Sequence, residues 1–216
     1  METPDWNSNS VGDDVYEPSE DTFLLLDALE NDLNNLKKII DKGGCLVLEL
    51  GSGSGVITAA LKKTLGSTVQ CIAVDINLQA CHTTLETCSL NNVNVDVINA
   101  NLLDWIFQSK SIDIIIFNPP YVRSFVNEGD VDGKISDIKH AWCGGPVDGA
   151  DVIRRVLPQI NRVLADNGVF YLLMINYNNP EKIAHFMAQE FSMAHNIIIT
   201  RKVPGESLVV YKFYRT

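Results

Sequence analysis

The order of apolar and polar positions predicts alternating strands and helices over most of the chain. Short apolar runs bounded by glycine, asparagine or aspartate indicate buried strands, and apolar residues that recur every three or four positions indicate helices with one buried face. Five strands are predicted in this way: Cys45–Leu50, Val69–Val74, Val93–Ile98, Ile112–Phe117 and Val169–Ile175. The predicted helices are Val56–Leu65, Leu78–Leu90, Ala150–Leu164 and Pro180–Phe191, with a helical turn over Leu102–Phe107.

The chain before these strands has a different pattern. Residues 1–14 are polar and acidic, and we expect them to be flexible, with residues 15–216 forming a single domain. Ser19 provides an N-cap hydroxyl ahead of two acidic residues, and both features favour the start of a helix. The apolar residues from Phe23 to Leu33 then recur with helical spacing, and we expect this helix to end near Asn34 or Asn35. A short second helix is predicted over Leu36–Ile40.

Repeated alternation of strand and helix is typical of a parallel sheet with helices on both faces. The predicted turn between the helix that ends near Leu164 and the fifth strand is 166–168, Asp-Asn-Gly. The end of the chain differs, because the strands Asn196–Lys202 and Ser207–Phe213 are joined only by a short segment around Pro204-Gly205. A parallel connection needs about a dozen residues or more, so these two strands must pair antiparallel. We therefore predict an α/β fold with a mostly parallel seven-stranded sheet and an antiparallel last strand.

The first candidate for chemistry is the glycine-rich turn Glu49-Leu50-Gly51-Ser52-Gly53-Ser54-Gly55, which follows the first strand and opens a helix. This is a nucleotide-binding position in open α/β sheets. The glycines are spaced G-x-G-x-G, whereas the dinucleotide fingerprint is G-x-G-x-x-G. The carboxylate of Glu49 opposes a pyrophosphate and suits a cation. This favours S-adenosylmethionine (SAM), which carries sulfonium and ammonium groups and no phosphate. The alternative is a tight strand-to-helix turn without a ligand.

Two further positions fit a nucleoside. Asp75 ends the second strand about 20 residues after the glycine turn, where an acidic side chain can accept both ribose hydroxyls. Its alternative role is an N-cap for the helix that follows. Asn101 and Leu102 follow the third strand and could contact the adenine, although a turn asparagine is nearly as plausible from sequence.

The second candidate for chemistry is the turn Asn118-Pro119-Pro120-Tyr121, which directly follows the strand Ile112–Phe117. Ligands bind at the carboxyl ends of strands in open α/β sheets. Neither proline has a backbone N–H, so the turn offers carbonyl oxygens and the Asn118 amide to a group with N–H donors. The ring of Tyr121 could stack on a planar substrate. The pattern indicates a site for a planar amine or amide, and the alternative is a rigid turn that only closes the strand.

This turn suggests a mechanism for methyl transfer to an amide. An amide nitrogen is a poor nucleophile because its lone pair is delocalised. Acceptors from the Asn118 side chain and the Pro119 carbonyl, placed tetrahedrally on its hydrogens, would favour a pyramidal nitrogen whose lone pair faces the methyl group. Catalysis could then rest on positioning and electrostatics, with no dedicated general base.

Composition narrows the classes of function. The net charge is −10, from 27 acidic and 17 basic residues, whereas proteins that bind nucleic-acid phosphates usually have the opposite balance. No apolar run approaches the roughly 18–20 residues of a membrane span, so we expect no membrane association. The polar N-terminus is unlike a secretory signal. We expect a cytoplasmic location, with a nuclear one also open.

The cysteines and histidines show no metal-binding spacing. The five cysteines contain no CxxC pair, and the four histidines are scattered, so we predict reduced thiols and no metal in this chain. The long connection Val122–Asp148 contains Trp142-Cys143-Gly144-Gly145-Pro146. An aromatic residue beside paired glycines suits a lid over a site, and packing of Trp142 in the core is equally plausible.

Together these segments resemble the class I SAM-dependent methyltransferases, and more narrowly the HemK-type glutamine methyltransferases of the eukaryotic branch. The segments that carry the resemblance are 15–23 (Val-Tyr-Glu-Pro-Ser-Glu-Asp-Thr-Phe), 49–55, 75–77 (Asp-Ile-Asn), 117–122 and 141–145. The resemblance implies a Rossmann-like fold and SAM as the cofactor. By this resemblance, the cofactor-binding residues are Thr22, Glu49, Gly51, Gly53, Asp75, Ile76, Asn101, Leu102 and Asn118.

The resemblance also implies the reaction and its partners. The expected reaction is methylation of the glutamine side-chain amide in the Gly-Gly-Gln loop of a class 1 translation termination (release) factor. The catalytic residues would be Asn118, Pro119 and Tyr121, with Pro120 also contacting the substrate. Relatives often carry Asp where this chain has Asn101, which can still accept a hydrogen bond from adenine. Bacterial members have an N-terminal helical docking domain that we expect to be missing here.

Members of the eukaryotic branch work with a small zinc-binding activator subunit, which implies a heterodimer. We expect that subunit to dock along Val93–Ile98 and Leu102–Phe107, since exposed apolar edges tend to need covering. Three alternatives stay open: methylation of adenine in nucleic acid, methylation of a histone lysine, and a partner-binding scaffold without activity. The acidic charge disfavours the first, and the sequence supplies no obvious base for the second.

Overall fold

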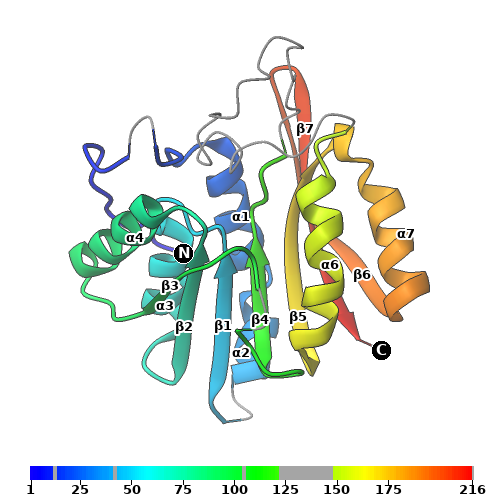
Figure 1. The fold of residues 1–216 in the computed structure, drawn as a ribbon, viewed down its shortest axis with the longest axis horizontal. Coiled ribbons are helices and arrows are strands. Elements are labelled where there is room, and N and C mark those ends of the chain that lie inside the picture. Colours follow the sequence, from blue (N-terminus) through cyan, green and yellow to red (C-terminus); the bar gives the residue numbers. More distant parts are fainter. Residues whose placement is uncertain (12–13, 41–42, 104–105, 122–147, 216) are drawn as a thin grey trace.

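The computed structural model describes residues 1–11, 14–40, 43–103, 106–121 and 148–215. A seven-stranded sheet in the order β3-β2-β1-β4-β5-β7-β6 forms its centre (Figure 1). The strands are β1 Cys45–Leu50, β2 Val69–Asp75, β3 Asp96–Asn99, β4 Ile112–Phe117, β5 Leu164–Ile175, β6 Met193–Val203 and β7 Glu206–Arg215. Neighbouring strands from β3 to β5 are parallel, and β7 is antiparallel to both β5 and β6. The predicted sheet is therefore confirmed.

Helices cover both faces of this sheet (Figure 1). They are α1 Glu20–Asn31, α2 Leu33–Ile40, α3 Val56–Leu65, α4 Leu78–Leu90, α6 Asp151–Val163 and α7 Pro180–Phe191, with the short 3₁₀ helix η1 Asn176–Asn178. Alternate residues of the central strands pack on opposite sides, so that Val47 contacts the core under α1–α3 whereas Leu48 contacts the core under α6 and α7. Both faces are buried, which explains the unbroken apolar runs of the strands. Among the described helices, none has the length and hydropathy to span a membrane.

Three predicted boundaries differ from the structure. The third strand begins at Asp96 rather than Val93, because the Val93 N–H donates to the Cys88 carbonyl at the end of α4 (3.0 Å). The expected turn at 166–168 is an irregular stretch inside β5, where Ile112 pairs with Leu164 but Ile114 pairs with Val169. The first helix ends at Asn31, because Asp32 turns into the interior and accepts a hydrogen bond from the Lys212 ammonium on β7 (2.6 Å).

Several of the first eleven residues, for which flexibility is the expectation from sequence, contact α4 in this structure. The Asn7 side chain donates to the Glu86 carboxylate (2.8 Å). The side chain of Asn91 accepts from the backbone N–H of Asp5 (3.1 Å) and donates to the backbone carbonyl of Asp5 (2.7 Å). Val11 is buried with Val15 and Ala80 in a small apolar cluster. The segment that leads into α1 is thereby attached to α4, next to the glycine-rich turn.

The last glycine of that turn is required by packing. Gly55 has φ +78°, and a Cβ on it would lie 2.6 Å from the Thr84 Cα of α4. Any side chain would therefore push α3 and α4 apart and strain the backbone. The close approach sets the glycine-rich turn, which spans 51–55, at the carboxyl end of β1.

Candidate active site

The carboxyl ends of β1, β2 and β4, three neighbouring parallel strands, carry the glycine-rich turn, Asp75 and Asn118 at the same end of the sheet (Figure 1). The backbone N–H of Gly51 donates to the Val74 carbonyl at the end of β2 (2.7 Å). A Cβ placed on Gly51 would lie 3.6 Å from the Phe117 ring and 3.8 Å from the Asn118 carbonyl oxygen. The glycine-rich turn therefore lies between the acid that ends β2 and the turn that follows β4.

Asp75 is held in place by the backbone around it. Its carboxylate accepts hydrogen bonds from the N–H groups of Gly53 (2.9 Å) and Asn77 (2.8 Å), and the side chain is 8% exposed. Burial raises the pKa of this carboxyl, and the backbone donors oppose the rise. A carboxylate has about four acceptor positions, so capacity remains for ribose hydroxyls. Capping of α4 falls to Asn77, whose side chain accepts from the Gln79 N–H (2.9 Å).

Glu49 is deeper than its predicted role suggested. Its side chain is buried at the end of β1, and the Thr58 hydroxyl of α3 donates to it. Burial raises the pKa of Glu49 to about 8, and the nearby Asp75 adds to the rise. The carboxyl is therefore mostly protonated at neutral pH unless a cation lies beside it, because a positive charge favours the ionised form.

This burial predicts a pH-dependent effect of the variant Glu49→Gln on stability. An acid whose folded pKa lies above its unfolded value stabilises the fold fully below the unfolded pKa, near 4.5, and loses this contribution as the pH rises to about 8. The free energy of unfolding of Glu49→Gln relative to wild type should therefore rise between pH 5 and pH 8, by no more than about 1.4 kcal/mol per pH unit, and the melting temperature should rise with it. Thermal unfolding of both proteins without cofactor measures this. A difference that stays constant with pH would show that Glu49 is ionised throughout.

The structure places the other predicted cofactor residues after β2, after β3 and in α1. Ile76, next to Asp75, is 49% exposed and offers an apolar surface to a base. Asn101 accepts a hydrogen bond from Arg155 (2.9 Å), and Leu102 has φ +55°, so both lie in a turn. Thr22 is buried in the first turn of α1, where its hydroxyl accepts from the Ser19 N–H (3.4 Å).

The turn after β4 contains an unpartnered acceptor. The Asn118 amide nitrogen donates to Asp21 (3.0 Å), whereas its carbonyl oxygen Oδ1 is buried and has no hydrogen-bond partner among the described residues. A buried polar atom without a partner costs about 1–3 kcal/mol, and such atoms usually mark a function or a missing ligand. This oxygen is the acceptor that the sequence predicted for a substrate N–H.

Tyr121 contributes its hydroxyl rather than only its ring. The hydroxyl donates to Asp21 (2.8 Å), and burial raises its pKa, so that it stays protonated. Tyr16 donates to the same carboxylate (3.1 Å), and burial raises its pKa as well. The backbone of the turn is held by Asn178, which is fully buried and whose amide donates to the Tyr121 carbonyl (3.4 Å).

Sequence reasoning missed Asp21, Tyr16 and Asn178 as members of this site. The local pattern indicates Asp21 only as an acid in the first turn of a helix, although it lies in the 15–23 segment that carries the family resemblance. Asn178 gave no sequence signal. The predicted lid residues 142–146 lie outside the described residues.

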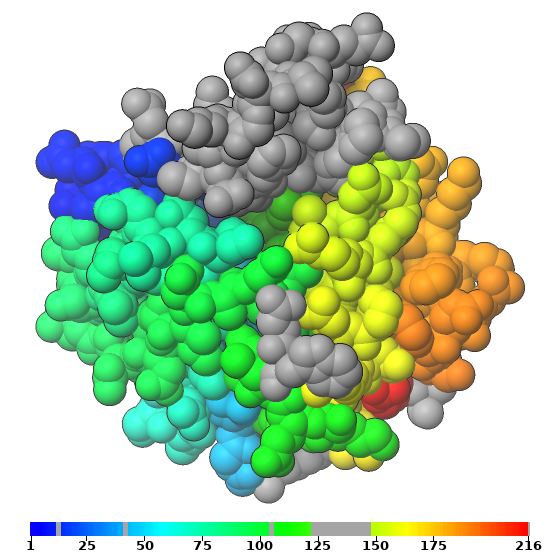
Figure 2. All heavy atoms as spheres, viewed as in Figure 1, coloured from blue at the N-terminus to red at the C-terminus, as the bar shows by residue number. Residues whose placement is uncertain are grey.

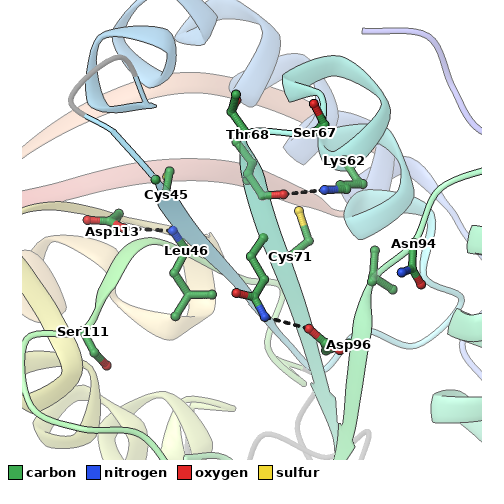
Figure 3. A pocket seen from close by; sticks show the side chains of 14 residues that line it. Cys45, Leu46, Lys62, Ser67, Thr68, Cys71, Asn94, Asp96, Ser111 and Asp113 are labelled. Carbon is green, nitrogen blue, oxygen red and sulfur yellow. Dashed lines mark hydrogen bonds between the residues drawn. The ribbon is translucent and has the colours of Figure 1, made fainter.

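Two cavities among the described residues are lined neither by the glycine-rich turn nor by Asp75. One of about 660 Å³ lies between the amino ends of β1, β2, β3 and β4, where Lys62 and Asp113 contribute to its wall (Figure 3). None of the predicted site residues lines it. A second of about 340 Å³ lies between α6 and α7 and reaches Asn178. The described residues contain no cluster of three acidic, histidine or cysteine side chains that could hold a metal.

The sheet order, the glycine-rich turn after β1 and the acid that ends β2 define a class I methyltransferase. The family model described as the methyltransferase small domain matches residues 20–136. The chain belongs to the HEMK2/Mtq2 family of methyltransferases, since it is 37% identical to human (Homo sapiens) methyltransferase HEMK2 over 94% of this chain and 91% of that protein. The predicted resemblance is thereby confirmed.

Two further relatives support this assignment. The catalytic subunit mtq2 of the eRF1 methyltransferase of Schizosaccharomyces pombe is 34% identical, over 94% of this chain and 90% of that protein. A chain of the E. cuniculi Mtq2–Trm112 complex, described as responsible for methylation of the eRF1 translation termination factor, superposes with a TM-score of 0.70 at 30% identity. That match covers 94% of this chain and 99% of the other.

Proposed function

We propose that this chain transfers a methyl group from SAM to the side-chain amide nitrogen of the glutamine in the Gly-Gly-Gln loop of a class 1 release factor. The observation that carries the proposal is the buried Oδ1 of Asn118, which has no hydrogen-bond partner among the described residues and belongs to a residue whose backbone lies next to Gly51 of the glycine-rich turn. The relatives support it, because the S. pombe protein is an eRF1 methyltransferase subunit and the E. cuniculi complex methylates eRF1.

The residues at the carboxyl ends of β1 and β2 fit the cofactor. Asp75 would accept from the ribose hydroxyls, and the open space over Gly53, where a Cβ would meet no atom within 4 Å, leaves room for the nucleoside. Ile76, which follows β2, would contact the adenine. Asn101 and Leu102, which follow β3, would also contact it. Bound SAM supplies an electrophilic methyl carbon on a sulfonium.

The chain's own groups position and activate the nitrogen. The Asn118 oxygen would accept one amide hydrogen of the glutamine, and the Pro119 carbonyl would accept the other. Two acceptors in this arrangement favour a pyramidal nitrogen, so its lone pair is free to form the new N–C bond as the S–C bond breaks. The extra proton then leaves the nitrogen for water. No base is needed, and the described neighbours Tyr16 and Tyr121 are protonated donors.

We also propose that the chain acts in a heterodimer with a small zinc-binding activator subunit, as Mtq2 forms a complex with Trm112 in E. cuniculi. The expected docking segment includes β3, which is an edge strand of the sheet, and edge strands are common places for a second chain to pair. Ile106 lies in the second part of the expected docking segment, Leu102–Phe107, and is 42% exposed.

This partner assignment predicts the effect of a charge at the docking segment. The variant Ile106→Asp should weaken binding of the activator subunit at least tenfold, which corresponds to about 1.4 kcal/mol, because a carboxylate would be desolvated in the interface. The matched control is Ile197→Asp on β6, the opposite edge strand, where the isoleucine is 56% exposed. Figure 2 shows the α4 region and α7 on opposite sides of one face of the molecule. An equal loss of affinity for the activator subunit in both variants, or no loss in Ile106→Asp, would contradict this docking site.

The catalytic proposal is tested by methyl transfer in the reconstituted complex. The chain and its activator subunit are incubated with methyl-labelled SAM and a class 1 release factor, in parallel with a factor whose Gly-Gly-Gln glutamine is replaced by alanine. Label is expected only in the factor that keeps the glutamine. Label in both factors would contradict the proposal, and so would label in neither when SAM binding is shown separately.

A further inference from the structure

The carboxylate of Asp21 is the centre of the hydrogen-bond cluster at the candidate active site. Its side chain is 2% exposed, and its Oδ2 accepts from the Asn118 amide nitrogen (3.0 Å), the Tyr121 hydroxyl (2.8 Å) and the Tyr16 hydroxyl (3.1 Å). Its other oxygen accepts from the Thr22 backbone N–H (2.7 Å). Every neighbour named here is a donor, so this cluster holds the carboxylate oxygens firmly in place.

This arrangement permits only one orientation of the Asn118 amide. The amide has an NH₂ group and an oxygen at its two ends, and only the NH₂ group can donate to a carboxylate. Rotation of the amide by 180° would place its oxygen against Asp21 oxygen and would leave the NH₂ group without this acceptor. The carboxylate therefore holds the NH₂ group toward Asp21 and leaves Oδ1 as the end of the amide that does not face it, where this oxygen is buried and has no partner among the described residues.

We propose that Asp21 is a positioning residue for catalysis, and that it acts by locking the Asn118 amide with its oxygen toward the substrate nitrogen. This inference rests on the proposed function for the step it serves. Without the lock, the two orientations of the amide would compete, and in the wrong one an NH₂ group would face the substrate N–H. Donor would then meet donor, and the substrate amide would lose one of its two acceptors.

A purely structural role for Asp21 makes different predictions. Acids in the first turn stabilise a helix through its dipole, and Asp21 occupies the first turn of α1. Glu20 is the adjacent acid in the same turn, but it pairs with Arg201 (3.4 Å) rather than with the site. Glu20→Gln removes the same charge from the same helix end, and it therefore serves as the matched control for Asp21→Asn.

The kinetic test is a double-mutant cycle with Asn118. Asp21→Asn keeps the shape of the side chain but offers an NH₂ group that can pair with the Asn118 oxygen in the flipped orientation. We expect Asp21→Asn to lower kcat at least tenfold, with the KM for SAM within about twofold, and Glu20→Gln to leave kcat within about twofold. In the Asn118→Ala background, Asp21→Asn should lower kcat by less than about twofold. Equal losses in both backgrounds, or an unchanged kcat in Asp21→Asn, would overturn the positioning role.

A second measurement does not depend on the substrate. The side-chain ¹⁵NH₂ signal of Asn118, assigned by its disappearance in Asn118→Ala, reports the hydrogen bond to Asp21 in the heterodimer. We expect this signal to move in Asp21→Asn and to stay in place in Glu20→Gln. If wild type proved inactive on release factor, the proposed function would fail while this signal still tested the lock. An unchanged signal in Asp21→Asn would overturn the lock whatever the activity.

Discussion

Replacement of Asn118 by alanine is expected to lower kcat by about 10²–10³-fold, the range found when one group that stabilises a transition state is removed. Alanine deletes the buried acceptor that would hold the glutamine amide, and it leaves the SAM-binding turn unchanged. Among the described residues, the side chain forms one hydrogen bond, to Asp21, so the cost to folding should be small. SAM affinity should change by less than about threefold, because the variant removes an interaction with the substrate amide and not with the bound cofactor. Initial rates and equilibrium SAM binding measure the two quantities.

Asn118→Asp is the informative companion to this variant. It keeps an acceptor oxygen but replaces the NH₂ group with a carboxylate oxygen. Two carboxylates would then face each other at the distance of the present hydrogen bond to Asp21 (3.0 Å), and their negative charges repel. We expect a loss of kcat comparable to that of alanine. If Asn118→Ala retained the wild-type rate while binding SAM, the substrate would not be held by this side chain.

Asp75→Asn is expected to raise the dissociation constant of SAM by about 10–100-fold. Hydrogen bonds to a charged group contribute about 1.5–3 kcal/mol, and the neutral amide would lose the charge that strengthens the bonds to the ribose hydroxyls. The variant keeps an oxygen that can still accept from the N–H groups that hold Asp75, so the fold should survive. Equilibrium dialysis or calorimetry with SAM gives the constant directly.

The matched control is Asp113→Asn on β4. Its carboxylate also accepts a backbone N–H, that of Leu46 (2.9 Å), but at the amino ends of the strands, beside the cavity in Figure 3. We expect its SAM affinity to match that of wild type within about twofold. Comparable weakening in both variants would mean that Asp75 acts through stability rather than through contact with the nucleoside.

Much of the fold was predictable because local signals were enough. A few consecutive residues were enough to predict β1 and β4 from their apolar runs, and to predict the tight turn from the glycines after β1. The carboxyl ends of parallel strands meet at one edge, so the convergence of the glycine-rich turn, Asp75 and Asn118 followed from topology. The short Pro204-Gly205 connection likewise fixed the antiparallel end of the sheet.

The parts that sequence could not predict depend on contacts between distant segments. Asp21 and Asn118 are 97 positions apart, and local pattern shows Asp21 only as an acid in a first turn. Helix α1 ends before Asp32, whose carboxylate accepts a hydrogen bond from Lys212. This contact could not be predicted from local pattern, because Lys212 lies 180 positions further along the chain. Burial also decided the state of Glu49, since its sequence position suggested a charged group and its surroundings favour a protonated one.

The most direct test of the account is site-resolved mass spectrometry of a class 1 release factor after incubation with the heterodimer and SAM. The account predicts a mass increase of one methyl group on the peptide that contains Gly-Gly-Gln, with fragmentation that places it on the glutamine side chain, and loss of that increase in Asn118→Ala. A methyl group on lysine, on a nucleic-acid base or on another residue, with the glutamine unmodified, would contradict it.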